Sequence, residues 1–548
     1  MKYIYFLAAL GLTTSCVDLD QDPISSIDVN SFYSTNEEVE TAVNGIYQIF
    51  THGGFYGLYN NHTVYFDELS TEYMKAGANT NSAHIREIGN CAVQPNNQFV
   101  IDSWEWSYTG INRANIVIDK VQNGPFTDEE KNRWQGEAKI LRAIHYFNLV
   151  RWYGDVPVVL HEGDCEGQAR DNVDVVYQQI VKDLEDGSRL PEVFAGSTEG
   201  RATRYTALGI LSKVYLTWAQ TASPLGEGNA AYNYQQAIAY ADQIIDSKKF
   251  ALEEHFLNNW AVNNKNGKES LFQVQHNRDN VSGHCTFAMG FSNSEPVLIL
   301  QNGIKKDDGS SFVYPAYERI DARDQRKDGS FAKSLPLPDT YEEDGTQSRF
   351  TYNVPLFRKY IDTINYTLAA PNSVGQSTNS SYLRYAEILL IKAEAENELN
   401  GPTATALEYI NQVRRRAYRH FPVTEASADD YTSAQLTDKE HFRWALQRER
   451  FNEFVAEGQH WFDLVRWRIL VKTVREGGDV SGSLKATNVG YKNYLFPLPQ
   501  PQLTLNKNLT QNWGYSGETS GSPFEGVEEQ HTSALIGWTS VDSPLQGY

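Results

Sequence analysis

The chain has 548 residues and a net charge of −21, with 69 acidic against 48 basic residues. This negative charge repels nucleic acid and anionic headgroups, so neither is expected as a partner. A neutral ligand suits such a surface better than an acidic polymer, unless a local basic pocket overrides the average.

The first 22 residues predict export. Lys2 precedes an apolar stretch at residues 4–12, and small or hydroxylated residues then lead to Cys16, which is the order of a secretory signal. The apolar stretch is far shorter than the roughly 20 residues that span a bilayer. It resembles a bacterial lipoprotein signal, which implies that residues 1–15 are removed and that Cys16 is lipidated; cleavage nearby without lipidation is the alternative. The acidic stretch at 18–22 is similar to the surface-export signal of Bacteroidetes lipoproteins.

We expect residues 16–35 to form the lipidated cysteine and a tether. A single body then follows over residues 36–548, with halves at about 36–250 and 251–548. No second long apolar stretch occurs, so this body is predicted to be soluble.

The three remaining cysteines, Cys91, Cys165 and Cys285, cannot all pair with one another and show no zinc-site spacing. Free buried thiols are expected, with a Cys91–Cys285 disulfide as the alternative. No cofactor is predicted. A structural calcium ion among the Asp and Asn residues stays open, although no EF-hand spacing occurs.

Helical periodicity predicts most of the regular structure. The first helix, over residues 38–50, follows a capping box at Ser34–Glu37, and Thr127–Glu130 opens another. Further helices are expected over 111–121, 169–187, 203–220, 232–247, 381–401, 404–419, 438–458 and 459–474.

Small residues inside and aromatic residues near the ends favour pairing of these helices, in the manner of tetratricopeptide repeats. Generic α-hairpins without repeat stacking are the alternative. The predicted pairs lie at about 127–186, 203–246, 382–418 and 439–474.

Irregular segments at residues 74–97 and 250–381 and after 477 interrupt this pattern, with β-like runs such as SLFQVQHN and EPVLIL. Loops of this length are usually functional or disordered. We therefore expect a mainly α scaffold with short β-hairpins, on which the loops carry the ligand surface.

Five long motifs and a closing segment resemble the SusD (RagB/SusD) family of Bacteroidetes outer-membrane lipoproteins, in order and spacing. The resemblance covers essentially the whole mature chain. The motifs lie at residues 137–159, 201–219, 382–401, 408–417, 448–467 and 494–515.

The resemblance implies a SusD-like fold and a non-enzymatic role at the cell surface. Such proteins bind a glycan and cover a SusC-like TonB-dependent β-barrel transporter, which imports the oligosaccharide. Two alternatives stay open: a peptide- or protein-binding import lid of the same family, and a glycoside hydrolase.

The ligand contacts are expected mainly in two irregular segments, residues 73–97 and residues 276–291. Aromatic rings there would cover the apolar face of a pyranose, while Asn, Arg, His and Asp would bond to its hydroxyl groups. Loops in comparable places bind glycans in related family members. The candidates are Asp67, Tyr73, Asn79, Asn81, His84, Arg86, His276, Arg278, Asn280, Phe287, Phe291 and Tyr314, with Tyr317 as a further possibility.

The acidic run at residues 67–72 does not predict a glycosidase, because neighbouring carboxylates in one short stretch seldom lie on opposite sides of a sugar. The charge-rich runs at 322–326 and 448–454 are expected to form internal ion pairs, as is Arg384 with Glu387. Core positions are predicted for Trp104, Trp461 and Trp467, and Trp106 is left open.

Overall fold

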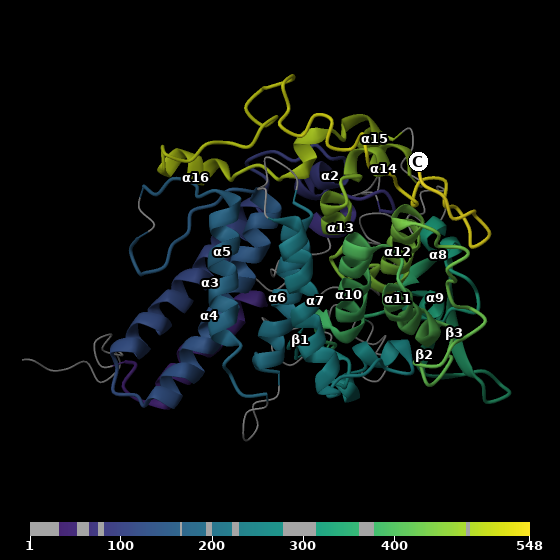
Figure 1. Ribbon diagram of the computed structural model, residues 1–548, viewed down its shortest axis with the longest axis horizontal. Helices are drawn as coiled ribbons and strands as arrows, with labels where there is room; N and C mark the ends of the chain where they lie inside the picture. Colours follow the sequence, from purple (N-terminus) through teal and green to yellow (C-terminus); the bar gives the residue numbers. More distant parts are fainter. Residues whose placement is uncertain are drawn as a thin grey trace, which may run out of the picture.

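The protein is mainly α-helical, as the sequence predicts (Figure 1). The computed structural model describes residues 32–51, 65–74, 82–164, 167–192, 200–221, 229–277, 314–360, 377–477 and 483–548.

The helices of the first half begin where the sequence places polar caps. Thr127 and Glu130 form the predicted capping box, whereas the first helix uses Thr35 and Glu38, one residue later than predicted. The helix predicted over 111–121 is part of a longer helix that begins at Gln98. This longer helix includes Trp104, which is buried, and Trp106, which is half-buried. The elements are α1 (Asn36–Tyr47), η1 (Gln48–Phe50), η4 (Tyr65–Leu69), α2 (Ala83–Gly89), α3 (Gln98–Asn123), α4 (Asp128–Tyr153), α5 (Val173–Gly187), α6 (Arg204–Ala219), α7 (Ala230–Ser247), η5 (Phe256–Trp260) and η6 (Val262–Asn264).

The second half holds the remaining helices. The predicted helix over 459–474 is two helices, because Arg468 adopts a positive φ of 58° and ends the first. Trp461 and Trp467 are buried as predicted. The elements are α8 (Tyr314–Arg319), α9 (Gln325–Ser330), α10 (Tyr385–Asn400), α11 (Ala404–Ala417), α12 (Lys439–Phe454), α13 (His460–Arg466), α14 (Leu470–Glu476), α15 (Leu484–Asn488), η8 (Tyr491–Tyr494) and α16 (Gln500–Leu505).

Three of the four predicted helix pairs form: α4 packs on α5, α6 on α7 and α10 on α11 (Figure 1). Ala237 and Ala241 are fully buried in the α6–α7 contact, where Ser212 Oγ donates to the Ala237 carbonyl. The fourth pair is wrong, because α12 packs mainly on α10, α11 and α9, whereas α13 packs on η4 and α14.

Two antiparallel two-stranded sheets complete the described fold. β1 (Ser270–Val274), which includes the predicted SLFQV run, pairs with β4 (Ser380–Arg384), and β2 (Phe331–Tyr341) pairs with β3 (Gln347–Phe357). The predicted helix at 381 therefore begins only after Arg384, because pairing with a strand over 100 residues earlier overrides its local period. The EPVLIL run lies outside the described residues.

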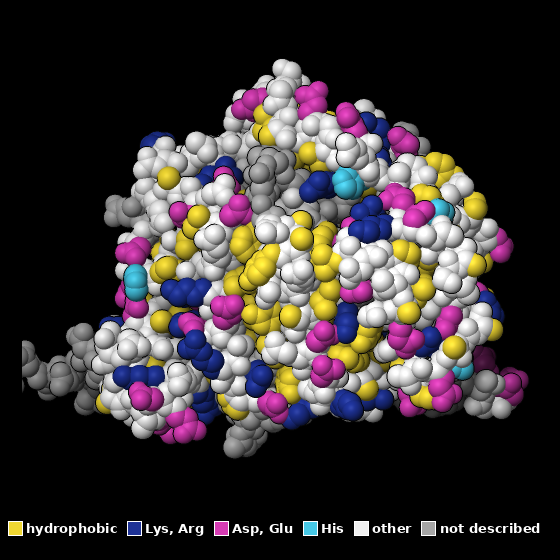
Figure 2. All heavy atoms as spheres, in the orientation of Figure 1, with side chains coloured by type: hydrophobic (Ala, Val, Ile, Leu, Met, Phe, Trp, Pro, Cys, Tyr) yellow, Lys and Arg dark blue, Asp and Glu magenta, His cyan; other side chains and the backbone are white. Residues whose placement is uncertain are grey.

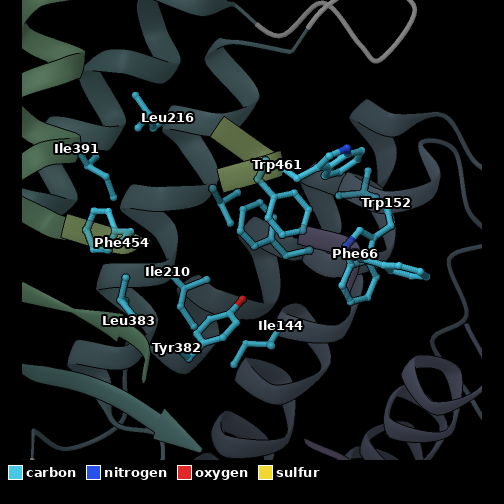
Figure 3. Close-up of a cluster of buried hydrophobic side chains, with 14 of the residues drawn as sticks. Phe66, Ile144, Trp152, Ile210, Leu216, Tyr382, Leu383, Ile391, Phe454 and Trp461 are labelled. Atoms are coloured by element: carbon cyan, nitrogen blue, oxygen red, sulfur yellow. The ribbon is translucent and has the colours of Figure 1, made fainter. Parts of the chain in front are cut away.

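Aromatic rings from distant segments meet in the core (Figure 3). Phe66 stacks on Phe496 with ring centroids 4.2 Å apart and meets Trp152 edge-on at 5.7 Å. Trp461 lies 5.0 Å from Phe496. These contacts join the first-half helices to the second half.

A buried ion network lies beneath α12. Glu453 accepts from Arg384 and Arg416, and Arg326 lies 3.1 Å from the same carboxylate. The charge-rich runs thus pair internally, as predicted. The prediction that Arg384 pairs with Glu387 is wrong, because Glu387 is bound by Lys213 and Arg450 instead.

The C-terminal segment closes over the first half. Asn512 Nδ2 donates to the Tyr153 carbonyl at 3.0 Å, and Arg170 donates to Asn512 Oδ1 at 2.7 Å. Lys485 is buried and donates to the carbonyls of Leu69, at 2.6 Å, and of Thr71 and Met74. These bonds join the C-terminal segment to the first half of the chain.

Candidate functional site

A small pocket lies between α4, α6, β4 and the turn after α12; we call it the central pocket. Its walls combine aromatic faces with hydroxyl, amide and charged groups, a composition that suits a polar organic ligand. It is lined by Asp67, Asn148, Arg151, Trp152, Lys213, Tyr360, Ser380, Ser381, Tyr382, Glu457, Gly458, Gln459 and Phe462.

The short π-helix η4 places Asp67 in this pocket. Trp152 Nε1 donates to Asp67 Oδ1 at 2.9 Å. Burial raises the pKa of Asp67 well above its ordinary value, and the indole bond only partly opposes this. The carboxyl group is therefore a hydrogen-bond donor as well as an acceptor over part of the pH range.

The next residue, Glu68, binds the turn after α12, which lines the central pocket. Its Oε1 accepts from the Gly458 amide at 2.6 Å, and its Oε2 accepts from the Tyr73 hydroxyl at 2.5 Å. Gly458 has a φ of 70°, a conformation that favours glycine. Burial raises the pKa of Glu68 to about 7.

Two buried lysines balance the carboxylates around the pocket. Lys213 Nζ lies 3.0 Å from Glu387 and donates to Gln459 Oε1 at 2.8 Å. Glu457 is bound by Lys359 at 2.7 Å and by Arg384. Burial lowers the pKa of Lys213 and of Lys359 to about 8 in each case.

A second small pocket, the side pocket, shares Arg151 and Phe462 with the central pocket. Its other walls come from α4, α5, the end of α6 and α13. Figure 2 shows a band of hydrophobic side chains across the middle of this face, over α5, α6 and α7. Tyr177 lines the side pocket and stacks on Trp218 with ring centroids 5.4 Å apart.

The structure brings two predicted site residues to the central pocket. Asp67 lines it, whereas His276 is buried beside it and lies 3.0 Å from Ser380 Oγ through Nε2. His276 therefore orients a lining residue instead of touching a ligand in the described pocket. His84 and Arg86 lie on α2, half-buried and exposed respectively, and line neither pocket.

The prediction of Tyr73 as a ligand contact is wrong. The side chain is only 1% exposed and packs edge-on against Phe451 and His460. It belongs to the core because the segment that looks irregular in sequence runs beneath α12 and α13.

The other predicted site residues stay predictions. Tyr314 begins α8 and its side chain lies outside the described part. Cys91 is a buried free thiol, while Cys165 and Cys285 are not described. Cys16 and the remaining candidates also lie outside the described residues: Asn79, Asn81, Arg278, Asn280, Phe287 and Phe291.

Several lining residues were missed because they lie on helices rather than loops. Lys213 is the one charged residue between Tyr205 and Ala219 of an otherwise apolar helix, and that isolation is a usable signal of a buried polar contact. Ser381 and Gln459 carry no such signal, because only the fold brings them to the pocket.

In the part of the chain that the structure describes, no group of three or more His, Cys, Asp or Glu side chains is arranged to hold a metal ion. Nor does any helix in those ranges have the length and hydropathy of a membrane span.

Paired helices around a pocket define a mainly α-helical protein, and comparison with known proteins identifies its family. A model described as "SusD family" matches residues 301–515, and one described as "Starch-binding associating with outer membrane" matches residues 19–216. The chain belongs to the SusD family.

Its relatives cover most of its length. The chain is 27% identical to SusD-like protein P2 of Formosa agariphila, over 93% of this chain and 99% of that protein. It is 23% identical to the starch-binding protein SusD of Bacteroides thetaiotaomicron, over 75% and 78% respectively. Among solved structures, a SusD homolog from Bacteroides thetaiotaomicron aligns with a TM-score of 0.69 at 26% identity, over 89% of this chain and 99% of the other.

Proposed function

We propose that the protein is a cell-surface lipoprotein that captures an oligo- or polysaccharide and passes it to a SusC-like TonB-dependent transporter. The central pocket carries this proposal, since it offers aromatic faces for sugar rings and polar groups for their hydroxyls. The starch-binding description of the family model supports the same ligand class.

The carboxylates of the pocket favour binding over hydrolysis. Both oxygens of Glu457 accept from Lys359 or Arg384, so this group is held in one orientation by protein partners. Asp67 Oδ1 accepts from Trp152. A glycosidase instead needs an acid and a base that face the same glycosidic bond. The protein is thus proposed to change no covalent bond.

Filling the central pocket should abolish capture. Ser381 is half-buried and lines the pocket, so Ser381→Trp should lower affinity at least about tenfold. Affinity gel electrophoresis and calorimetry against a polysaccharide panel measure the effect. Ser433→Trp, at an exposed position outside both pockets, is the matched control.

Unchanged glycan affinity in folded Ser381→Trp would rule out the central pocket as the capture site. New reducing ends in the wild-type incubation would favour the glycoside hydrolase instead. Retention by peptides and by no glycan would favour the peptide-binding alternative.

Replacing Cys16 by Ala should release the protein from the membrane. Removal of the acyl-bearing thiol leaves no described helix that could span a bilayer. Fractionation of cells that express each form measures this. Retention of Cys16→Ala in the membrane fraction to the wild-type extent would contradict a lipid tether at this residue.

A further inference from the structure

Arg151 stands at the junction of the two pockets and lines both. Its guanidinium lies between the rings of Phe147 and Phe462, 3.9 and 3.7 Å from their centroids. Nε donates to the Phe147 carbonyl at 3.0 Å, and Nη2 donates to Asn148 Oδ1 at 2.7 Å. The group is therefore fixed in orientation before any ligand arrives.

These two bonds use one edge of the guanidinium fork. The other edge carries one N–H on Nη1 and one on Nη2, and neither donates a hydrogen bond to any of the described residues. Two parallel donors in one plane match the two oxygens of a carboxylate.

Arg151 also differs from the other cations of these walls. Lys213 is paired with Glu387, and Arg466 is paired with Glu394 and Asp463. Across the described chain, Arg151 has no carboxylate within ion-pair distance. A half-buried charge without a counterion costs free energy that an anionic ligand would recover.

The nearby carboxyl groups supply that counterion only in part. Glu457 already binds Lys359 and Arg384. Burial raises the pKa of Asp67, and the positive charge of Arg151 opposes this rise without reversing it, which favours the uncharged, donating form of Asp67. A ligand carboxylate would meet donors in the pocket, despite the net charge of −21 on the whole chain.

We propose that Arg151 binds the carboxylate of a uronic acid residue, so that the captured glycan is an acidic one. This inference rests on the proposed glycan-binding function and specifies its ligand class. The guanidinium would bind the carboxylate through its open edge, while Tyr382 lines the same pocket and would contact the sugar ring.

The test compares each of two uronic acid oligosaccharides, from homogalacturonan and from alginate, with its carboxyl-reduced counterpart. Calorimetry should show at least about tenfold tighter binding of one acidic form than of its reduced form. This preference should weaken at high ionic strength, because salt screens the charge pair.

Substitutions test whether Arg151 causes the preference for the acidic oligosaccharide. Arg151→Gln should remove the difference between acidic and reduced forms, whereas Arg151→Lys should keep part of it, since it retains charge but loses the fork. Arg189→Gln, on a 73% exposed side chain at the end of α5, is the matched control and should keep the full preference. Thermal unfolding confirms that each variant is folded.

Equal binding of acidic and reduced oligosaccharides would overturn the inference and leave the proposed function intact. Binding of neutral or sulfated glycans alone would do the same. A preference that survives in folded Arg151→Gln would also overturn it. If no glycan binds, whether acidic, sulfated or neutral, both the inference and the proposed function would be overturned.

Discussion

Glu453→Gln is expected to lower the free energy of unfolding by about 3–5 kcal/mol. The carboxylate is fully buried and neutralises parts of three guanidinium groups, those of Arg326, Arg384 and Arg416. An amide keeps one acceptor but leaves these cations underpaired in a medium of low dielectric. Urea unfolding followed by circular dichroism measures the change.

Glu343→Gln provides the control, because Glu343 lies exposed in the turn between β2 and β3. Its effect should stay within about 0.5 kcal/mol. Equal unfolding midpoints for the two variants would contradict the network as a source of stability.

The effect should also depend on pH. Burial opposes ionisation of Glu453, but the guanidinium groups outweigh it and hold its pKa well below 4.5. A depressed pKa stabilises the fold above the unfolded-state pKa, and this contribution is lost as the pH falls through the folded-state value. The difference between wild type and Glu453→Gln should therefore be largest near neutral pH and shrink only in strong acid.

Tyr73→Ala is expected to destabilise the fold by about 3–5 kcal/mol, the range for truncation of a buried aromatic ring. The ring fills space between Phe451 and His460, and its hydroxyl donates to Glu68. Tyr73→Phe should cost only about 1 kcal/mol, because it removes the hydroxyl alone. Thermal and urea unfolding separate the two variants.

Tyr232→Ala is the control, at a side chain that is 49% exposed, and it should change stability much less. An unaltered melting temperature in Tyr73→Ala, together with lost glycan binding, would restore Tyr73 to the ligand surface and contradict its place in the core.

Local signals predict the scaffold well. Capping boxes and apolar periodicity depend on residues only a few positions apart, so the sequence alone predicts the α4–α5 and α6–α7 pairs. The predicted elements are wrong where contacts with residues distant in sequence determine the secondary structure. The strand at β4 forms because β1 lies beside it, and the break at Arg468 separates two helices that the period alone would join.

The site is less predictable than the scaffold. Sequence reasoning places ligand contacts on loops, whereas Arg151 and Lys213 project from helices of the scaffold. Asp67, Ser381 and Gln459 come from three segments that only tertiary packing brings together. A polar residue on a buried helix face is the one local sign of such a site.

The closure of the C-terminal segment over the first half bears on how the chain acquires its structure. Lys485 bonds to Leu69 across 416 positions, and Asn512 bonds to Tyr153 across 359. Contacts of such sequence separation form late, because long loops must close first. The packing of the early helices is thus completed only when residues near the C-terminus are present. A chain that ends before Lys485 lacks the donor for the carbonyls of Leu69, Thr71 and Met74. Under the proposed export, this favours assembly after passage through the inner membrane, when the whole chain is present.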